Sequence, residues 1–447
     1  MDLDGTLIAS DSMWEAALLL ARKRPLDLLL FPLWIIKGRP HFKQKLFDRA
    51  MPDAALLPYR QDLLAMLRQQ KEQGAKLVLA TGSDQRMAAA VCQHLGIFDD
   101  YIATDGITNM TRERKLAELE RRFGAGGFDY AGNSAADLCL WRAARRSYLV
   151  DVPPLVKRRA LATGTPAAIF DYSRGRLSAA VRALRPHQWM KNLLVLLPLV
   201  LAHQLNDRSR VAAAVWAFWA FCLCASAIYI VNDLLDLESD RKHPTKRNRA
   251  FASGQLQAPL GLAMAGTLLL AAFAICFAEP PAFLLALATY FIATCAYSLW
   301  LKRRLLVDVF LLAGLYTIRL IAGAVGAQVP MSMWLLAFSM FFFLSLAFAK
   351  RYAELLQVQE AGAEVASGRM YLVSDLRIIE GVGPASGYLA VLVFCNYLDS
   401  PKATLLYHHP HLLWLIAPIL LYWITRIWFL ARRGALDQDP ILFALRD

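Results

Sequence analysis

The sequence predicts a soluble domain followed by an all-α polytopic membrane domain. Of its 447 residues, 57% are hydrophobic and only 19% are charged, which is too apolar for an ordinary soluble or disordered protein of this size. The first 180 residues have mixed polarity and no long apolar run. After Pro186, apolar stretches of about twenty residues alternate with short charged loops, and this length spans a bilayer core of about 30 Å. The chain is therefore expected to be an integral membrane protein.

Eight apolar stretches are candidate spans. We expect them at roughly 190–205, 211–232, 258–278, 281–300, 305–327, 332–349, 378–398 and 411–431. With residue 1 in the cytoplasm, the inside loops and the tail hold 15 Lys and Arg, and the outside loops hold three. By the positive-inside rule, this bias predicts a cytoplasmic first domain.

Three aspartates follow the second expected span. Asp233, Asp236 and Asp240 stand at positions i, i+3 and i+7, which places their side chains within about 60° of each other on one helical face. Three like charges on one face repel one another unless a cation lies among them. Mg²⁺ held by few carboxylates and by substrate phosphate oxygens fits this arrangement. The alternative is a solvated helix end whose acids pair with Arg241 and Lys242.

A dense cationic loop comes next, at the same membrane face. Its basic residues are Arg241, Lys242, Lys246, Arg247 and Arg249. Metal-binding carboxylates beside Arg and Lys suit a diphosphate substrate, because metal and cations together stabilise charge on the leaving group. A basic loop alone could equally bind anionic lipid headgroups. The aspartates and the loop together favour phosphate chemistry.

These motifs resemble a known family. The patterns NDxxDxxxDR at 232–241 and HPxKxxR at 243–249, with Ala252 and Gly254, are similar to the first signature of the UbiA superfamily of intramembrane prenyltransferases. Further segments resemble the decaprenyl-phosphate phosphoribosyltransferase branch, which joins 5-phosphoribosyl diphosphate to a polyprenyl phosphate. They are RPHQWMKN at 185–192, YSLWLK at 297–302, Asp308 with Tyr316 and Arg319, KRYAEL at 350–355 and DPILFALRD at 439–447. The family has nine spans, so the resemblance implies one span beyond the eight visible here.

The resemblance implies roles for individual residues. Asp233, Asp236 and Asp240 would hold Mg²⁺ against the ribosyl diphosphate, with Asn232 orienting it. The substrate-binding cations would be Lys191, Arg241, Lys246, Arg249, Lys302, Arg319 and Lys350. Arg319 lies inside a span, where an unpaired charge costs at least about 2.5 kcal/mol, so we expect it to face a polar cavity or a partner. Pairing with Asp308 on the same helix is disfavoured, because the two are about 16 Å apart. Tyr297 fits a substrate contact or an interfacial aromatic equally well.

One departure from the wider superfamily affects the expected reaction. Prenyl-transferring members carry a second DxxxD motif after the sixth span, where this chain has KRYAE at 350–354 with a single acid. One metal with several cations suits transfer of 5-phosphoribose to a lipid phosphate. Two alternatives stay open: transfer of a polyprenyl group from its diphosphate to a small acceptor, and a non-enzymatic transporter or lipid-binding protein.

The first domain carries motifs of a second family. Asp2 and Asp4 form a DxDGT pattern that resembles the haloacid dehalogenase-like phosphohydrolases, with an α/β Rossmann-like fold and a small helical cap, here residues 10–70. The resemblance implies that Asp2 is the nucleophile, Asp4 the general acid and base, and Mg²⁺ the shared counterion of Asp2, Asp4 and Asp137. Thr81 would bind the phosphoryl oxygen, and Lys115 matches the motif cation. The fourth motif departs from the family, since Gly132 is followed by Asn133 and not by Asp.

The expected organisation is a hydrolase domain at 1–155, a linker at 156–185 and a transferase domain at 186–447. The nucleophile of this family ends a central strand of about five residues, so the strand before Asp2 is expected to be missing. Together the two resemblances imply a bacterial inner-membrane protein whose phosphatase removes the 5-phosphate of the lipid product. Expected partners are polyprenyl phosphate, 5-phosphoribosyl diphosphate and the bilayer. Nucleic acid is not expected, because the basic residues flank spans and lack interleaved aromatics.

Overall fold

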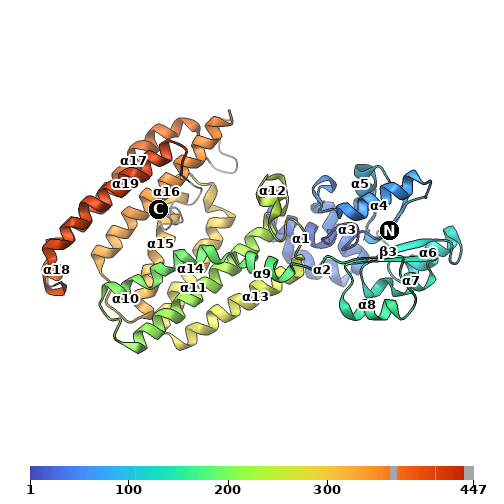
Figure 1. Ribbon diagram of the computed structural model, residues 1–447, viewed down its shortest axis with the longest axis horizontal. Helices are drawn as coiled ribbons and strands as arrows, with labels where there is room; N and C mark the ends of the chain where they lie inside the picture. The colour runs from blue at the N-terminus through green and yellow to red at the C-terminus, as the bar shows by residue number, and fades with distance from the viewer. Residues whose placement is uncertain (106, 363–369, 408, 437–447) are drawn as a thin grey trace. The chain divides into compact units, whose positions relative to one another are not determined.

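The computed structural model describes the whole chain except residues 106, 363–369, 408 and 437–447 (Figure 1). The chain folds into two compact units. The first comprises Met1–Leu184 and Tyr229–Ala265, and the second comprises Arg185–Ile228 and Gly266–Asp447. We describe each unit by itself.

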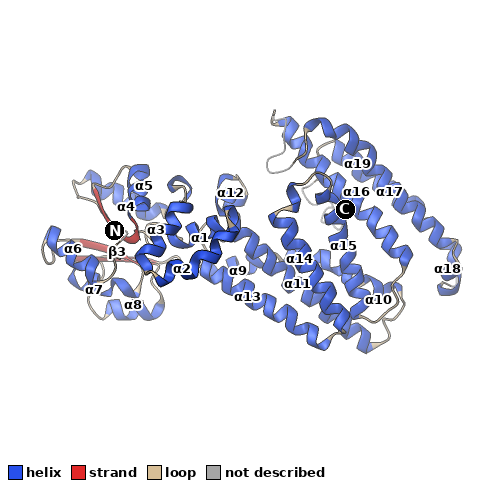
Figure 2. Ribbon diagram, turned by 180° about the vertical axis from the view of Figure 1, so that it is seen from behind, coloured by secondary structure: helices blue, strands red, loops and turns tan. Residues whose placement is uncertain are grey.

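The first unit contains parallel β-structure. Its strands are β1 (Val78–Asp84) and β2 (Asp100–Thr104) in one sheet, and β3 (Asp129–Gly132), β4 (Arg146–Val150) and β5 (Ala168–Phe170) in another. The strands are rich in apolar residues, as expected where both faces of a parallel sheet are covered. Figure 2 shows α4 (Gln61–Glu72) and α5 (Gln85–Leu95) on one side of the strands and α7 (Leu138–Ala143) and α8 (Pro154–Leu161) on the other.

The start of the chain joins the two sheets. The Met1 amino group donates to the Val78 carbonyl at 3.0 Å, and Ala80 N–H donates to the Met1 carbonyl at 2.8 Å. On the other side, Asp2 N–H donates to the Ala131 carbonyl at 3.0 Å. Two residues thus occupy the central position between β1 and β3, where the sequence predicts a strand to be missing. This backbone pairing sets Asp2 beside Ala131, near the carboxyl end of β3.

A helical cap follows Asp4, as predicted, but it ends at Arg49 and not near residue 70. It consists of α1 (Ser12–Lys23), η1 (Pro25–Leu30), α2 (Phe31–Ile36) and α3 (Arg39–Arg49). Helix α1 begins where the Asp11 carboxylate caps the N–H groups of Met13 and Trp14. The α/β fold with a small helical cap is therefore confirmed.

The end of the first domain differs from the expected boundary. Strand β5 pairs in parallel with β4, with Leu149 opposite Ile169, inside the segment that the sequence analysis treats as linker. The strand has only three residues, which is too short to produce a readable alternation of polar and apolar positions. Helix α9 (Arg176–Leu184) then ends the first stretch of the unit.

The membrane domain is all-helical, as predicted. Seven helices among the described residues are long and apolar enough to span a bilayer: Arg208–Leu235, Ala258–Ala278, Pro281–Leu299, Val307–Gly326, Met333–Glu360, Val373–Leu398 and His411–Arg432. The expected span at 190–205 is instead the 3₁₀ helix η4 (Pro186–Val195) followed by the short α10 (Leu197–Leu201). Pro198 contributes to this break because it lacks the N–H that a continuous helix needs.

Small residues allow close helix packing in the second unit. A Cβ atom on Gly323, in α15 (Val307–Gly326), would lie 1.9 Å from the Val195 carbonyl oxygen of η4. Similarly, a Cβ on Gly383 would lie 2.0 Å from the ring of Trp428, whose indole N–H donates to the Ser345 hydroxyl at 3.1 Å. Close backbone approach at small residues is how membrane helices gain packing energy.

Substitution of Gly323 by Ala is expected to destabilise the membrane domain. The added methyl group has no room against backbone, and such overpacking costs about 1–3 kcal/mol. Gly314→Ala on the same helix is the matched control, since nothing lies within 4 Å of a Cβ there. Thermal unfolding in detergent should show a lower Tm for Gly323→Ala and no loss for Gly314→Ala. Equal Tm values would contradict the close contact.

Candidate functional site

The first site lies in the first unit, around Asp2. Lys115 of α6 (Glu113–Phe123) donates from its buried Nζ to Asp2 Oδ1 at 2.9 Å and to the Tyr130 hydroxyl at 3.1 Å. The Thr6 hydroxyl donates to Asp2 Oδ2 at 3.4 Å. Burial raises the pKa of Asp2 to about 6, and the Lys115 cation opposes that shift. The structure thus brings Asp2 and Lys115 together, as the motif order predicts.

Asp4 lies in a different environment from Asp2. Its Oδ1 accepts the Ser12 N–H at 2.7 Å, which ties it to the first turn of the cap. Burial raises the pKa of Asp4 to about 7, and the Asp11 charge adds to the shift. A carboxyl with this pKa can hold a proton near neutral pH, as a general acid must.

Thr81 is fully buried on β1. Its hydroxyl oxygen accepts the Ser83 N–H at 3.0 Å, and the neighbouring Ala80 bonds to the Met1 backbone. Thr81 therefore lies at the same sheet edge as Asp2, and its phosphoryl contact stays a prediction.

Sequence reasoning missed Lys43. This residue of α3 donates to the Gly82 carbonyl, and its Nζ lies 3.3 Å from Asn109 Oδ1. Burial lowers its pKa, while the charges of Asp4 and Asp11 raise it. Lys43 brings a cap cation into the hydrolase site. Its sequence context, an ordinary amphipathic helix, gives no signal of this placement.

Asp137 and Asn133, the residues of the fourth motif, have different surroundings. Asp137 accepts four hydrogen bonds: from the Tyr130 hydroxyl at 2.9 Å, the Asn133 N–H at 3.2 Å, and the Ser134 N–H and hydroxyl at 3.0 and 2.9 Å. These bonds close the turn after β3. The Asp137 carboxylate already accepts these four hydrogen bonds, and its predicted metal contact stays a prediction. Asn133 instead lies against Gly5, where a Cβ would be 1.9 Å from Asn133 Nδ2.

The donor atoms at this site suit a hard cation. If Mg²⁺ binds here, the Asp2 carboxylate and the Asn133 amide would offer oxygen ligands of the kind that this ion prefers. With one charged ligand fewer than the usual Gly-Asp motif provides, the site is expected to hold the ion less tightly.

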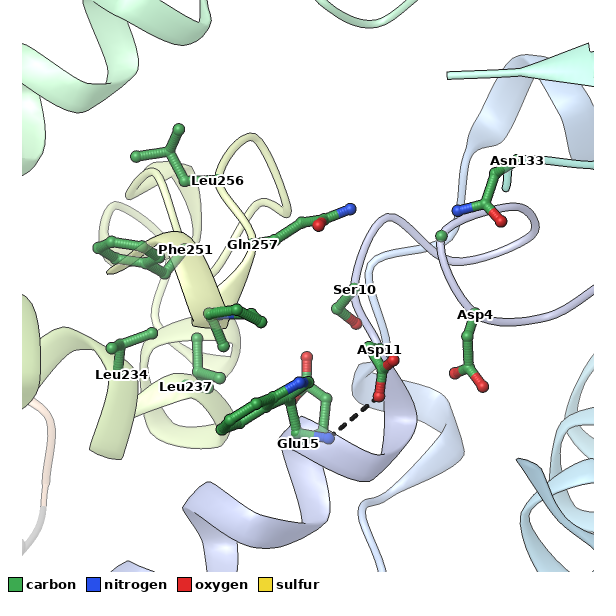
Figure 3. Close-up of a pocket in the computed structure, with 14 residues that line it drawn as sticks. Asp4, Ser10, Asp11, Glu15, Asn133, Leu234, Leu237, Phe251, Leu256 and Gln257 are labelled. Carbon is green, nitrogen blue, oxygen red and sulfur yellow. Dashed lines mark hydrogen bonds between the residues drawn. The ribbon is translucent and has the colours of Figure 1, made fainter. Parts of the chain in front are cut away.

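A cavity of about 140 Å³ adjoins Asp4 within the first unit (Figure 3). One side is polar and carries Asp4, Ser10, Asp11 and Asn133. The other side comes from the end of α11 and the segment after it, and carries the apolar Leu234, Leu237, Phe251 and Leu256 together with Gln257. The cavity is therefore amphipathic.

The aspartate motif of the membrane domain is only partly arranged as expected. Helix α11 (Arg208–Leu235) ends before Asp236, and α12 (Leu237–Lys242) begins after it. Because of this break, the three carboxylates do not all contact the same partner. The Arg249 guanidinium lies between Asp233 and Asp240, at 3.1 and 2.7 Å, whereas Asp236 pairs with Arg22 of the cap at 2.5 Å.

These carboxylates still influence one another. Burial raises the pKa of Asp240, Arg249 opposes the shift, and the charges of Asp233 and Asp236 add to it. In the part of the chain that the structure describes, no three His, Cys, Asp or Glu residues are arranged as a metal-binding group. Asp233 and Asp240 both contact the Arg249 guanidinium, so their carboxylates lie close together, and their Mg²⁺ contact stays a prediction.

The basic residues after the motif have distinct contacts. Arg241 forms a two-pronged ion pair with Glu15 of α1, at 2.6 and 3.0 Å, and donates from Nε to the Ala252 carbonyl at 2.9 Å. Arg241 thus ties the motif to the cap. Lys246 begins η5 (Lys246–Asn248) and is half-buried, and Asn232 is half-buried near the end of α11. Their substrate roles stay predictions.

Arg319 is buried in the second unit among polar groups. Its Nε donates to Asn192 Oδ1 at 2.8 Å, and its Nη2 donates to the Tyr290 hydroxyl at 3.0 Å. The rings of Tyr290 and Tyr316 lie 4.7 and 5.4 Å from the guanidinium carbon. Arg319 therefore has partners other than Asp308, as its spacing predicts. Asn192 was missed as a partner, although it belongs to the motif at 185–192.

Asp308 pairs with Arg351 instead. The carboxylate lies 2.8 Å from Arg351 Nη2 and accepts the Tyr371 hydroxyl at 2.7 Å, and both charged side chains are fully buried. Glu354 also contacts Arg351. Because burying an isolated charge is costly, this cluster is stable only as a unit.

The remaining predicted residues lie on four different elements of the membrane domain. Lys191 is buried on η4, and Tyr297 on α14 (Pro281–Leu299), Lys302 on η7 (Leu301–Arg303) and Lys350 on α16 (Met333–Glu360) are half-buried. Their substrate roles stay predictions. The motif at 439–447 lies outside the described residues.

An α/β domain with paired aspartates, joined to a polytopic helical domain, defines a membrane-bound enzyme with two domains. The UbiA prenyltransferase family matches residues 193–446, and the chain belongs to this family. Residues 1–142 match the haloacid dehalogenase-like hydrolases, so the first domain is of that type. Both predicted resemblances are confirmed.

Several curated proteins are similar to all or part of this chain. The uncharacterized protein y4nM of Sinorhizobium fredii is 37% identical over 450 residues, which cover all of this chain and 87% of that protein. Nodulation protein NoeC of Azorhizobium caulinodans is 34% identical over 59% of this chain and 86% of its own length. Decaprenyl-phosphate phosphoribosyltransferase of Mycolicibacterium smegmatis is 38% identical over 45% of this chain and 65% of its own length.

Solved structures give a weaker match. A UbiA homolog from Archaeoglobus fulgidus, bound to DMAPP and Mg²⁺, is 15% identical, with a TM-score of 0.46 over 56% of this chain and 85% of that one.

Phosphatase activity should fall as the pH rises through about 7. Asp4 holds its proton below that value and loses it above, so the general acid disappears on the alkaline side. The measurement is hydrolysis of p-nitrophenyl phosphate by the purified protein as a function of pH. Asp4→Asn should lower the rate at least about 100-fold and remove the alkaline limb. A limb that persists in Asp4→Asn would assign it to another group.

Asn133→Asp should tighten Mg²⁺ binding at the hydrolase site. A carboxylate beside the Asp4–Gly5 turn replaces a neutral amide with a charged ligand, so the Mg²⁺ concentration for half-maximal phosphatase activity should fall about tenfold. Asn206→Asp, at an exposed position outside the site, is the control. The same Mg²⁺ requirement in both variants would place the ion away from Asn133.

Proposed function

We propose that the membrane domain transfers 5-phosphoribose from 5-phosphoribosyl diphosphate to a polyprenyl phosphate, with Mg²⁺, and that the first domain then removes the 5-phosphate of the product. The general support for this proposal is family membership, because the chain combines a UbiA-family transferase domain with a haloacid dehalogenase-like domain. Similarity to decaprenyl-phosphate phosphoribosyltransferases supports the donor and acceptor.

One observation carries the choice of reaction. The segment at 350–354, where prenyl-transferring members have a second aspartate pair, presents Arg351, which is fully buried and paired with Asp308. Its single acid, Glu354, is engaged by the same guanidinium. A second group of metal-binding carboxylates is therefore not provided by this segment. One metal with surrounding cations fits a ribosyl diphosphate donor better than ionisation of a prenyl diphosphate.

The transferase step needs charge stabilisation on a leaving diphosphate. The bond from ribose C1 to the diphosphate oxygen breaks, a bond from C1 to an oxygen of the lipid phosphate forms, and diphosphate leaves. Mg²⁺, when bound by Asp233 and Asp240, supplies Lewis-acid stabilisation of that leaving group. Arg249, which already lies between these carboxylates, is well placed to bind the phosphate oxygens. In the second unit, Arg319 is held rigid by Asn192 and Tyr290 and would add a fixed positive charge.

The hydrolase step uses residues of the first domain. Asp2 attacks phosphorus while Lys115, bonded to the same carboxylate, offsets the negative charges. Asp4 gives its proton to the leaving sugar oxygen, and water then releases phosphate from Asp2. Support for a lipid-linked substrate comes from the amphipathic cavity beside Asp4, which has a polar wall and an apolar wall.

The proposal includes the protein's location. We propose that the first domain lies in the cytoplasm and that the membrane is the inner membrane of a bacterium; the excess of Lys and Arg in the loops on one side supports the cytoplasmic orientation. Both reactions then draw on cytoplasmic substrates at one membrane face.

The test is a coupled assay. The purified chain in detergent is incubated with Mg²⁺, polyprenyl phosphate and 5-phosphoribosyl diphosphate, and the lipids are analysed by mass spectrometry. A lipid heavier by ribose, with diphosphate and phosphate released, supports both steps, and one heavier by ribose phosphate supports the first alone. Product formed only from a polyprenyl diphosphate and a small acceptor would favour prenyl transfer and overturn the proposal.

Variants should separate the two steps. Asp240→Asn is expected to lower transfer at least about 100-fold, because a carboxylate of the predicted Mg²⁺ site is lost. Asp2→Asn should leave transfer intact and cause the ribose phosphate lipid to accumulate. Asp207→Asn, an exposed acid outside both sites that pairs with Arg210, is the matched control. Full transfer by a folded Asp240→Asn variant would refute the metal assignment.

A further inference from the structure

An apolar surface on the cap lies outside the sites described above. Helices η1 and α2 form the apolar segment Pro25–Ile36, which is too short to span a membrane. Five of its large aliphatic side chains face solvent, with exposed fractions between 57% and 81%. They are Leu26, Leu29, Leu33, Ile35 and Ile36. We call these five residues the cap patch.

The segment is held rigidly to the cap by its opposite side. Trp34 is buried, its ring lies 5.6 Å from that of Phe31, and the Arg49 guanidinium packs over it at 4.6 Å. Phe42 of α3 meets Phe31 edge to face at 5.1 Å. The cap patch is therefore a fixed feature of a packed helix pair. Residues 26, 29, 33 and 36 recur at the spacing of one helical face.

Charge around the cap patch is positive. Four exposed cations flank it: Lys23 and Arg24 before the segment, and Lys37 and Arg39 after it. Its single acid, Asp27, is neutralised by Arg49 at 3.1 Å. An apolar face bordered by Lys and Arg matches an anionic lipid surface, which takes aliphatic side chains between its headgroups and attracts the cations.

We propose that the cap patch docks into the headgroup region of an anionic lipid bilayer. The chain is itself embedded in a bilayer, so the first domain is always tethered near such a surface. The occupant is thus a lipid surface that is present at high effective concentration, and tethering makes even weak insertion effective.

Docking at this place would orient the hydrolase site. The cap patch leads directly into α3, which carries Lys43 to the Gly82 carbonyl. The helices that carry the cap patch are therefore connected directly to α3, which carries Lys43 into the hydrolase site. A phosphate on a lipid-anchored substrate then needs only lateral diffusion to approach Asp4.

The test uses the full chain in nanodiscs. A photoreactive diazirine amino acid is placed at position 29 or 36, and at position 121 as a control, because Arg121 is an exposed residue of α6 outside the cap patch. After illumination, lipid adducts are counted by mass spectrometry. We expect adducts at 29 and 36 to exceed those at 121 by at least about fivefold, and to rise when phosphatidylglycerol is added to phosphatidylcholine.

Two variants sharpen the result. Leu26→Asp with Leu33→Asp should reduce lipid adducts from position 29 to the control level, whereas Ile107→Asp, at a position that is 89% exposed but distant in sequence, should not. Changing Lys23, Arg24, Lys37 and Arg39 to Gln should remove the phosphatidylglycerol dependence. Adduct levels at 29 and 36 equal to those at 121 would overturn the proposal. So would crosslinks predominantly to a second copy of the chain, seen as a doubled mass on a denaturing gel.

Discussion

Buried charge must meet an opposite charge or a hydrogen-bonding partner, and this constraint shapes both units of the protein. In the first unit it sets Lys115 against Asp2 and Glu15 against Arg241. In the second it sets Arg351 against Asp308 and surrounds Arg319 with an amide and a phenol. Each pair fixes the position of an element that carries predicted site residues. Apolar packing then fills the space around these fixed points.

The fold could be predicted further than the details of the site. Composition and motif order were enough for the helical membrane domain and the α/β domain, because long apolar runs and a DxDGT pattern each have few structural solutions. The break at Asp236 was not predictable from spacing, since a periodicity argument assumes a continuous helix. Strand β5 was missed because three residues carry too little pattern. The segment expected to span at 190–205 is not one continuous helix, because Pro198 interrupts an otherwise apolar run.

Partner choice was the least predictable aspect. Asp308 and Arg319 share a helix, and the distance between them correctly argued against an ion pair. No sequence pattern, however, indicates that Arg351 is the partner of Asp308. The same holds for Lys43, which reaches the hydrolase site only because the cap folds back on β1. Contacts between residues distant in sequence depend on tertiary packing, and a single sequence contains no direct signal of it.

Two ion pairs join α1 of the cap to the aspartate motif. Glu15 and Arg22 belong to the hydrolase domain, while their partners Arg241 and Asp236 belong to the transferase signature. A cut in the connecting segment would leave an uncompensated charge on each fragment at these positions. The cap and the aspartate motif therefore depend on each other for the pairing of the buried Glu15 and Arg241 charges.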